Sequence, residues 1–275
     1  MISNKYVSRT VLTFACAAAT LLATASRASA QGFDVTVFTG LAYPVYDQRL
    51  TLTPGGPSIP GVDVTVADPL VLRGDGGAVF AAAVTYEFAR GLVGIEGRVD
   101  SIAAGIDFSG ARYEVRGTSF PFQGISASIR ASPGRFDAER IHVLSLDARI
   151  RTRGTVSLIA SGGISYLPDI TVTGSVPLSV VAPDLPSLGV NTGLTLRATP
   201  EQSGHRLGVN GGAGVRIGGR VALVAEVRGF YFREYGLRFG TTEGPSLVDD
   251  LLAGADVVSF TPIFVNAQAG VTVRF

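Results

Sequence analysis

The stretch Ile263 to Phe275, with the sequence IFVNAQAGVTVRF, is the part of the chain that decides the fold. Apolar side chains occupy alternate positions in it, and polar side chains such as Asn266, Gln268 and Arg274 lie between them. Successive side chains of a β-strand point to opposite faces, so this alternation predicts a strand with one apolar face. The stretch Arg206 to Ile217, RLGVNGGAGVRI, repeats the pattern.

Eight segments of the chain alternate in this way, and no segment shows a sustained helical period. In approximate residue numbers they are 33–43, 78–88, 92–106, 138–151, 155–166, 205–217, 220–235 and 257–275. An even number of antiparallel strands is what closure of a bacterial single-chain barrel requires. The segments therefore predict an all-β fold, an eight-stranded antiparallel up-and-down β-barrel.

Short and long connections alternate strictly between these segments. The short ones are Ala89-Arg90-Gly91, Thr152-Arg153-Gly154 and Gly218-Gly219, and the long ones are 44–77, 107–137, 167–204 and 240–256. Of the 14 prolines, 13 lie in the long connections, as expected because proline cannot donate a hydrogen bond to a strand ladder. All four long loops should therefore lie at one end of the barrel.

The long loops contain some alternation of their own. Val62 to Val66 and Ile170 to Thr173 both alternate apolar and polar side chains. We expect these segments to extend some hairpins as two-stranded ribbons beyond the barrel.

The first 30 residues have the composition of a secretory signal peptide. Lys5 and Arg9 supply the positive start, Val11 to Ala25 is apolar, and Ala28-Ser29-Ala30 is a small-residue cleavage site. We expect residues 1–30 to be removed on export and residues 31–275 to form the barrel domain. The only cysteine, Cys16, would leave with the signal peptide, so the exported chain would form no disulfide.

The composition of the polar row indicates which face of the strands points inward. Alternation alone would also suit a soluble lipocalin-like barrel or a soluble sandwich, but their water-facing rows would carry many long charged side chains. Here the polar row is largely small, only 16% of all residues are charged, and 46% are hydrophobic. We therefore expect the apolar row to face lipid and the polar row to face the barrel interior. The net charge of +1 disfavours a nucleic-acid-binding surface.

The few charged residues of the polar row should pair with each other inside the barrel. An eight-stranded barrel is just wide enough for side chains to fill it, and an unpaired buried ion is costly. We predict a luminal ion network drawn from the acids Asp34, Glu87, Glu96, Asp100, Asp147 and Glu226 and the arginines Arg98, Arg149, Arg151, Arg206, Arg216, Arg228 and Arg274. The glycines from Gly208 to Gly214 would leave room for these side chains to cross the interior.

The final strand resembles that of the small eight-stranded outer-membrane β-barrels of Gram-negative bacteria, the class of the OmpA transmembrane domain, OmpX and OmpW. The resemblance rests on the terminal Phe275 and the apolar positions Val271 and Val273 before it. In that family such a strand is the signal read by the barrel assembly machinery. The resemblance implies an outer-membrane location, short periplasmic turns and long extracellular loops.

The sequence does not predict an enzyme, a cofactor or a metal site. His142 lies on the apolar row, and the next residue on that row is Leu144 rather than a serine. His205 has no second histidine or cysteine with which to share a metal. The acidic loop residues Glu243, Asp249, Asp250 and Asp256 lack the ligand spacing of a calcium loop.

Two functions remain open at the level of sequence, with a lipid-modifying enzyme as a remote third. The first is a non-enzymatic outer-membrane barrel with a lumen plugged by ion pairs and with surface loops for contact, adhesion or envelope integrity. The second is an OmpW-like conduit for small or apolar solutes. The expected partners are outer-membrane lipid and lipopolysaccharide, the phosphates of which Arg112, Arg116 and Arg130 could clamp.

Overall fold

The structure is a computed structural model that describes residues 32–45, 47–50, 61–88, 92–121, 123–138, 140–168, 172–181, 190–200, 206–241 and 258–275. The predicted signal peptide, the turn 89–91, His205 and the acidic segment 243–256 lie outside these residues. Among the described residues, no helix has the length and hydropathy of a membrane span.

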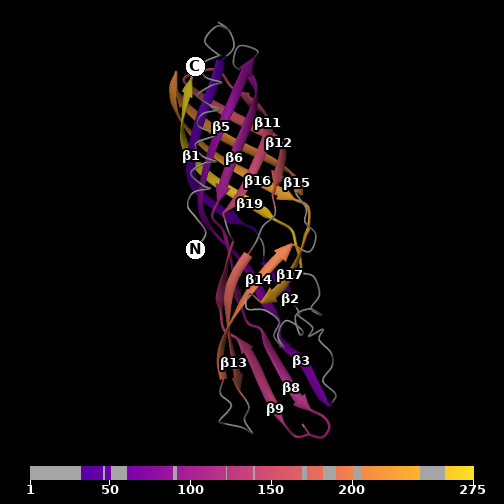
Figure 1. The fold of residues 1–275 in the computed structure, drawn as a ribbon. Helices are drawn as coiled ribbons and strands as arrows, with labels where there is room; N and C mark the ends of the chain where they lie inside the picture. The colour runs from indigo at the N-terminus through magenta and orange to yellow at the C-terminus, as the bar shows by residue number, and fades with distance from the viewer. Residues whose placement is uncertain are drawn as a thin grey trace.

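Eight strands form a closed antiparallel barrel, which confirms the predicted fold class (Figure 1). In spatial order they are β1 (Gly32–Pro44), β19 (Ile263–Arg274), β16 (Val221–Phe232), β15 (Arg206–Gly218), β12 (Val156–Leu167), β11 (Ile141–Arg151), β6 (Val93–Ile102) and β5 (Gly77–Phe88). Each strand either lies inside its predicted segment or extends past the predicted bounds by one residue. The ring is closed by the first and last of these strands, in a register that pairs Asp34 with Arg274 and Pro44 with Phe264.

Alternation along each barrel strand separates an apolar exterior from a polar interior. In β11, Leu144, Leu146 and Ile150 are exposed, whereas Asp147 and Arg149 between them are buried. Leu158, Leu207, Val209 and Leu223 are similarly exposed on other strands. A continuous apolar exterior with a polar interior is the pattern of a transmembrane barrel.

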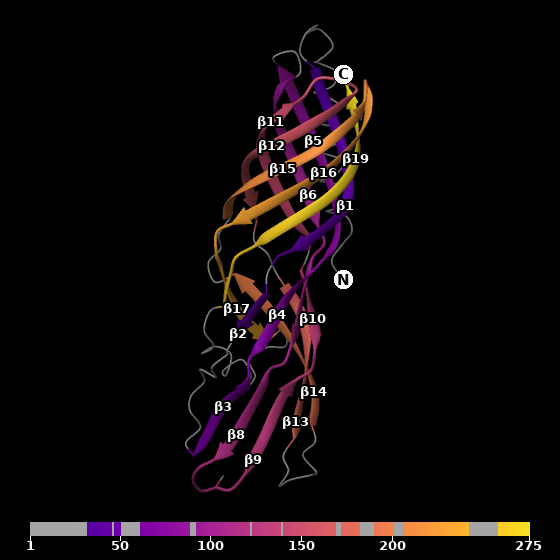
Figure 2. The same ribbon diagram turned by 180° about the vertical axis from the view of Figure 1, so that it is seen from behind.

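A second sheet of eleven strands continues from one end of the barrel (Figure 2). Its main path runs β18 (Val258–Phe260), β17 (Tyr235–Thr241), β14 (Val190–Pro200), β13 (Val172–Val181), β10 (Gly134–Ala138), β7 (Gly105–Ser109), β4 (Leu70–Asp75) and β2 (Asp47–Leu50). Beside this path, β3 (Val62–Asp68), β8 (Arg112–Gly117) and β9 (Ser126–Ala131) pair with one another in order.

The order of strands in the main path repeats the order in the barrel. Each barrel strand is adjacent in sequence to one strand of the path, and seven of the eight barrel pairings recur between the corresponding strands. The exception is the closing pair, since β1 and β19 pair in the barrel but β2 and β18 do not pair in the described structure. The second sheet is therefore an opened continuation of the barrel wall.

Some loop hairpins do extend beyond the barrel, as β8 with β9 and β13 with β14, but they belong to one larger sheet rather than to two-stranded ribbons. Strands from different loops pair with one another, as in β3 with β8, β9 with β13 and β14 with β17. The predicted strand 92–106 is also interrupted at Ala103 and Ala104, where the barrel strand β6 ends and β7 begins. Gly77 lies against the carbonyl of Ala103 there. The two segments approach so closely that position 77 has no room for a side chain.

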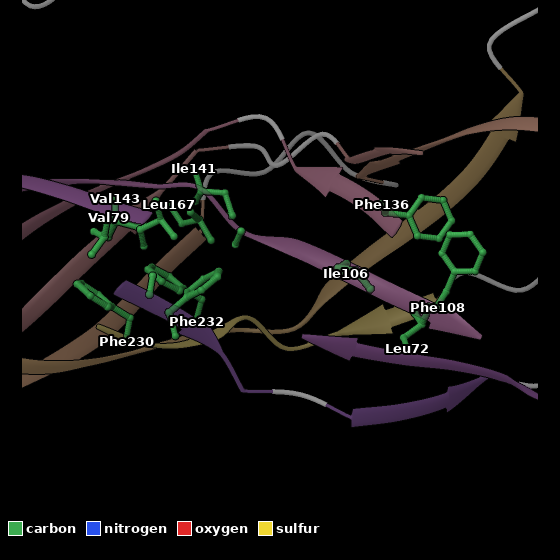
Figure 3. Close-up of a cluster of buried hydrophobic side chains, with 14 of the residues drawn as sticks. Leu72, Val79, Ile106, Phe108, Phe136, Ile141, Val143, Leu167, Phe230 and Phe232 are labelled. Carbon is green, nitrogen blue, oxygen red and sulfur yellow. The ribbon is translucent and has the colours of Figure 1, made fainter. Parts of the chain in front are cut away.

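A hydrophobic cluster joins the barrel to the second sheet. Figure 3 shows Phe230 and Phe232 beside Val79, Val143 and Leu167 in the barrel end. Phe108 and Phe136 pack on each other within the second sheet, with ring centroids 4.6 Å apart, and belong to the same cluster. Tyr113 packs against this cluster, and burial raises the pKa of its hydroxyl.

The exposed apolar row predicts a strong difference between two otherwise similar substitutions. Leu146→Arg on the barrel exterior should lower the free energy of unfolding by about 2–4 kcal/mol, the usual cost of an arginine facing lipid near the bilayer midplane. Val64→Arg on the second sheet should change it by less than about 0.5 kcal/mol, as for an ordinary surface site. Urea titration in lipid vesicles, followed by far-UV circular dichroism, measures both. Equal, small costs would mean that the barrel exterior faces water.

Candidate functional site

The barrel interior contains three successive layers of buried side chains. We call the end with the short turns the turn end and the opposite end the sheet end. An arginine-rich layer lies at the turn end, a dense ionic layer lies in the middle, and an apolar layer lies at the sheet end. The three layers together are the candidate site.

Arg228 on β16 is the centre of the ionic layer and is fully buried. Its Nε donates to Glu226 Oε1 at 2.7 Å, and its Nη2 donates to Glu96 Oε1 at 2.9 Å. Its Nη1 donates to Asp147 and, at 2.8 Å, to Asn210 Oδ1. One guanidinium thus binds three carboxylates. These contacts offset the free-energy cost of removing its charge from water.

Arg98 on β6 forms a second centre beside the first. Its Nε and Nη2 donate to the two oxygens of Asp100 at 2.8 and 3.0 Å, a bidentate arrangement with strong, directional hydrogen bonds. The same guanidinium reaches Glu226 at 3.1 Å and Gln268 at 2.7 Å on the opposite wall. It also lies over the ring of Phe38, with its carbon 4.5 Å from the centroid.

Arg149 on β11 extends the ionic layer toward the turn end. Its Nη1 donates to Glu96 Oε2 at 2.6 Å and to Thr85 Oγ1 at 2.9 Å. The Thr85 hydroxyl donates to the same carboxylate oxygen at 3.1 Å. Each charged group of this layer therefore has an opposite charge in contact with it.

Glycine on the inward row leaves the space that this network occupies. A Cβ built on Gly212 would lie 3.0 Å from Glu226 Oε1 and 3.3 Å from Arg228 Nε. A Cβ on Gly163 would lie 2.6 Å from a carboxylate oxygen of Asp147. Side chains at these two positions would push the ion pairs apart.

The arginine-rich layer lies at the turn end. Arg274 binds both oxygens of Asp34, at 2.8 and 3.1 Å, and also contacts Glu87. Arg151 lies 3.0 Å from Glu87 Oε2. Arg216 is 3% exposed and donates from Nη2 to the Gly219 carbonyl at 2.6 Å. The layer therefore holds three arginines but two carboxylates, and Arg274 and Arg151 are the arginines in contact with those carboxylates.

The apolar layer closes the sheet end of the interior. Phe230, Phe232 and Phe264 are 1%, 0% and 2% exposed and lie on the same inward row as the charged residues. Phe232 packs edge-on against Phe264 with centroids 6.5 Å apart, and Val143 and Leu167 are fully buried with them. Wide aromatic side chains from the neighbouring strands β16 and β19 fill the barrel at this level.

The structure brings together most of the charged residues predicted for the network and adds an apolar layer that was not predicted. Twelve of the thirteen charged residues predicted for the network line the interior and contact other charged or polar groups: Asp34, Glu87, Glu96, Arg98, Asp100, Asp147, Arg149, Arg151, Arg216, Glu226, Arg228 and Arg274. The thirteenth, Arg206, is half-buried at the start of β15. The uncharged polar members Asn210, Gln268 and Thr85 were not singled out, although they share the inward row. Three phenylalanines at the sheet end of that row were the available signal for the apolar layer.

Other predicted site residues lie outside the interior. Val271 and Phe275 are exposed on the last strand, with Val273 half-buried between them, and their reading by the assembly machinery stays a prediction. His142 is exposed on the outer face of β11. Among the described residues, no group of histidine, cysteine and acidic side chains could hold a metal ion.

The arginines predicted to contact lipopolysaccharide lie on β8 and β9. Figures 1 and 2 place these strands at the end of the second sheet farthest from the barrel. Arg112 lies 3.1 Å from Asp68, and Arg116 lies 3.3 Å from Glu114. Arg130 is paired in register with Arg112, so two like charges face each other across the strands.

The fold and the interior define the class of protein. A closed eight-stranded antiparallel barrel with an apolar exterior and a charged interior is the architecture of the small outer-membrane β-barrels, so the resemblance predicted from the last strand is confirmed at the level of the fold. No protein-family model and no curated protein matches the chain.

Three solved structures are similar to the chain. OprG from Pseudomonas aeruginosa is 13% identical, with 88% of this chain and 95% of that chain covered and a TM-score of 0.38. The outer membrane protease OmpT from Escherichia coli is 11% identical, with 89% and 96% covered and a TM-score of 0.36. A FadL homologue from Pseudomonas aeruginosa is 11% identical, with 89% and 90% covered and a TM-score of 0.23. At this level of similarity they do not define the function of this chain.

The contacts of Arg228 predict a large loss of stability on its removal. Arg228→Ala should lower the free energy of unfolding by about 3–5 kcal/mol, because Glu96, Asp147 and Glu226 would lose a buried partner. Arg116→Ala, which removes an exposed arginine, should cost no more than about 1 kcal/mol. Since the chain has no tryptophan, unfolding is best followed by circular dichroism and by heat-dependent gel mobility in detergent. Similar losses in both variants would contradict a central role for Arg228.

Proposed function

We propose that this chain is an integral outer-membrane barrel without enzymatic activity, with a closed interior and with an exposed second sheet that makes surface contacts. The closed ring supports insertion in a bilayer, because it satisfies the backbone hydrogen bonds of all eight strands without an open edge. Exposed Leu158, Leu223 and Ile150 on the exterior support the same conclusion. The predicted signal peptide supports export to the outer membrane.

The burial of Arg228 is the main observation that supports the proposal of a closed interior. Its guanidinium has no exposed surface, and its hydrogen bonds connect β16 to Glu96 on β6 across the barrel. Ion flow along the barrel would require this contact to break. The phenylalanines of the apolar layer add a second barrier, because an ion that enters apolar surroundings loses its hydration.

The non-enzymatic proposal is supported by how the buried acids are used. Glu96, Asp147 and Glu226 each accept hydrogen bonds from arginine, which holds them as structural anions rather than as proton acceptors for a substrate. On the outer face, exposed His142 has Leu144 as its neighbour along the strand. A lipid-modifying site would need a nucleophile beside that histidine.

The second sheet supports a role in contact at the cell surface. It extends the barrel wall by strands from all four long loops, which the family resemblance assigns to the exterior. The β8–β9 hairpin at its far end exposes Phe120 almost completely. We propose that this sheet serves contact, adhesion or envelope integrity.

Conductance across a planar bilayer tests the closed interior. Wild-type protein should carry little or no steady current. Glu96→Ala with Arg98→Ala removes part of the ionic layer, and Phe232→Ala with Phe264→Ala removes part of the apolar layer. Because the two barriers lie in series, the combined variant should conduct more than either pair alone.

The controls separate a leak from misfolding. Each variant should first show the heat-dependent gel mobility of a folded barrel, and Arg116→Ala should stay as closed as the wild type. A steady current through wild-type protein would overturn the closed interior and favour the alternative function, a conduit for small or apolar solutes.

A lipopolysaccharide-binding role for the second sheet is a separate proposal. The facing pair Arg112 and Arg130 supports it, because a bound phosphate would relieve the repulsion between them. Reversing Arg112, Arg116 and Arg130 to glutamate should lower the lipopolysaccharide that co-purifies with the protein. The same reversal at Arg153 and Arg220, at the turn end, should not. Unchanged co-purification in the first variant would count against this contact.

A further inference from the structure

A cavity of about 710 Å³ lies at the turn end of the barrel. The β11–β12 and β15–β16 turns and the end of β19 surround it. Five of its lining residues are arginines, namely Arg151, Arg153, Arg216, Arg220 and Arg274. No acidic residue is among the residues that line it.

Nearby carboxylates do not balance these arginines. Asp34 and Glu87, the acids of the adjacent layer, are engaged by Arg274 and Arg151. Arg153 and Arg220 are exposed on the two turns and add further positive charge at the opening. The cavity therefore carries an excess of positive charge.

Arg216 is the buried member of this group, and its hydrogen bonds are incomplete. It is 3% exposed, and among the described residues no carboxylate lies within ion-pairing distance of its guanidinium. Its Nη2 donates to the Gly219 carbonyl, whereas its Nε is buried without a hydrogen-bond partner in the protein. A buried, unsatisfied charged donor is costly unless something binds it.

We propose that this cavity is an anion-binding site for a phosphate group, with Arg216 at its base and Arg153 and Arg220 at its opening. Guanidinium groups bind the oxygens of phosphate in pairs, so several arginines around one cavity suit such a ligand. The phosphate would supply the acceptor that Arg216 Nε lacks.

Two sources of phosphate can reach this position. One is a soluble anion that enters from the compartment facing the turns. The other is the headgroup of a phospholipid in the adjacent leaflet, since exposed Phe275 joins the cavity lining to the apolar exterior of the barrel. The site has the same chemistry in both cases.

Binding of inorganic pyrophosphate to the full-length protein in a neutral detergent, measured by isothermal titration calorimetry, tests the site. Wild-type protein should bind it. Arg216→Gln should weaken binding by about tenfold or more, the usual effect of losing a charge-assisted hydrogen bond. The double variant Arg153→Gln with Arg220→Gln should also weaken it, and it leaves the buried layers intact, so that the result does not depend on the folding of the Arg216 variant.

Arg73→Gln with Arg233→Gln is the matched control, because it removes the same charge from two exposed arginines that do not line the cavity. The control should bind pyrophosphate as wild type does. Absence of binding to wild type, or an equal loss in the control, would overturn the proposal. The measurement is independent of conductance, so its failure would leave the closed interior untouched.

A competition experiment identifies the source of the phosphate. Mixed micelles that contain phosphatidylglycerol should displace pyrophosphate if the natural ligand is a lipid headgroup. Displacement that is lost in the Arg153→Gln, Arg220→Gln variant supports a lipid site. Pyrophosphate binding that phosphatidylglycerol leaves unchanged supports a soluble anion at the same site.

Discussion

Charge pairing across the middle of a ring that its own side chains fill is the constraint on which this structure depends. Arg228 and Arg98 lie on β16 and β6, which are four places apart in a ring of eight and thus opposite each other. Arg228 reaches Glu96 on β6, and Arg98 reaches Glu226 on β16. These reciprocal contacts connect opposite walls of the barrel. They stabilise the charges and also fix the distance between the walls.

The three layers fill different levels of the barrel interior with different kinds of side chain. Ion pairs fill the middle, where glycines such as Gly212 give them space. Aromatic rings fill the sheet end, where the barrel continues into a sheet that has its own apolar core. At the turn end arginines outnumber carboxylates, so that layer is electropositive. It also contains the cavity, whereas the other two layers are packed. The interior therefore changes from apolar at the sheet end to electropositive at the turn end, which is the end where we propose that an anion binds.

Much of the barrel was predictable from the sequence because each strand is specified by the pattern of its own residues. Period-two alternation identifies each strand, and the scarcity of charge on the inward row indicates that its ions pair. Residues such as Glu96 and Arg228 could be named, but their partners could not, because pairing across the interior depends on strand order and stagger. The second sheet was less predictable still. Its pairings join different loops, as between Val64 on β3 and Val115 on β8, and no local pattern specifies them.

The open seam of the second sheet has a consequence for self-association. Where the barrel wall opens, β2 and β18 are sheet edges with backbone groups that another chain could pair with. Within the part of the chain that the structure describes, both are very short, at four and three residues. A short edge offers too few backbone hydrogen bonds for a strand of a neighbouring molecule to pair with it. The second sheet can therefore stay open without joining copies of the protein to one another in the plane of the bilayer.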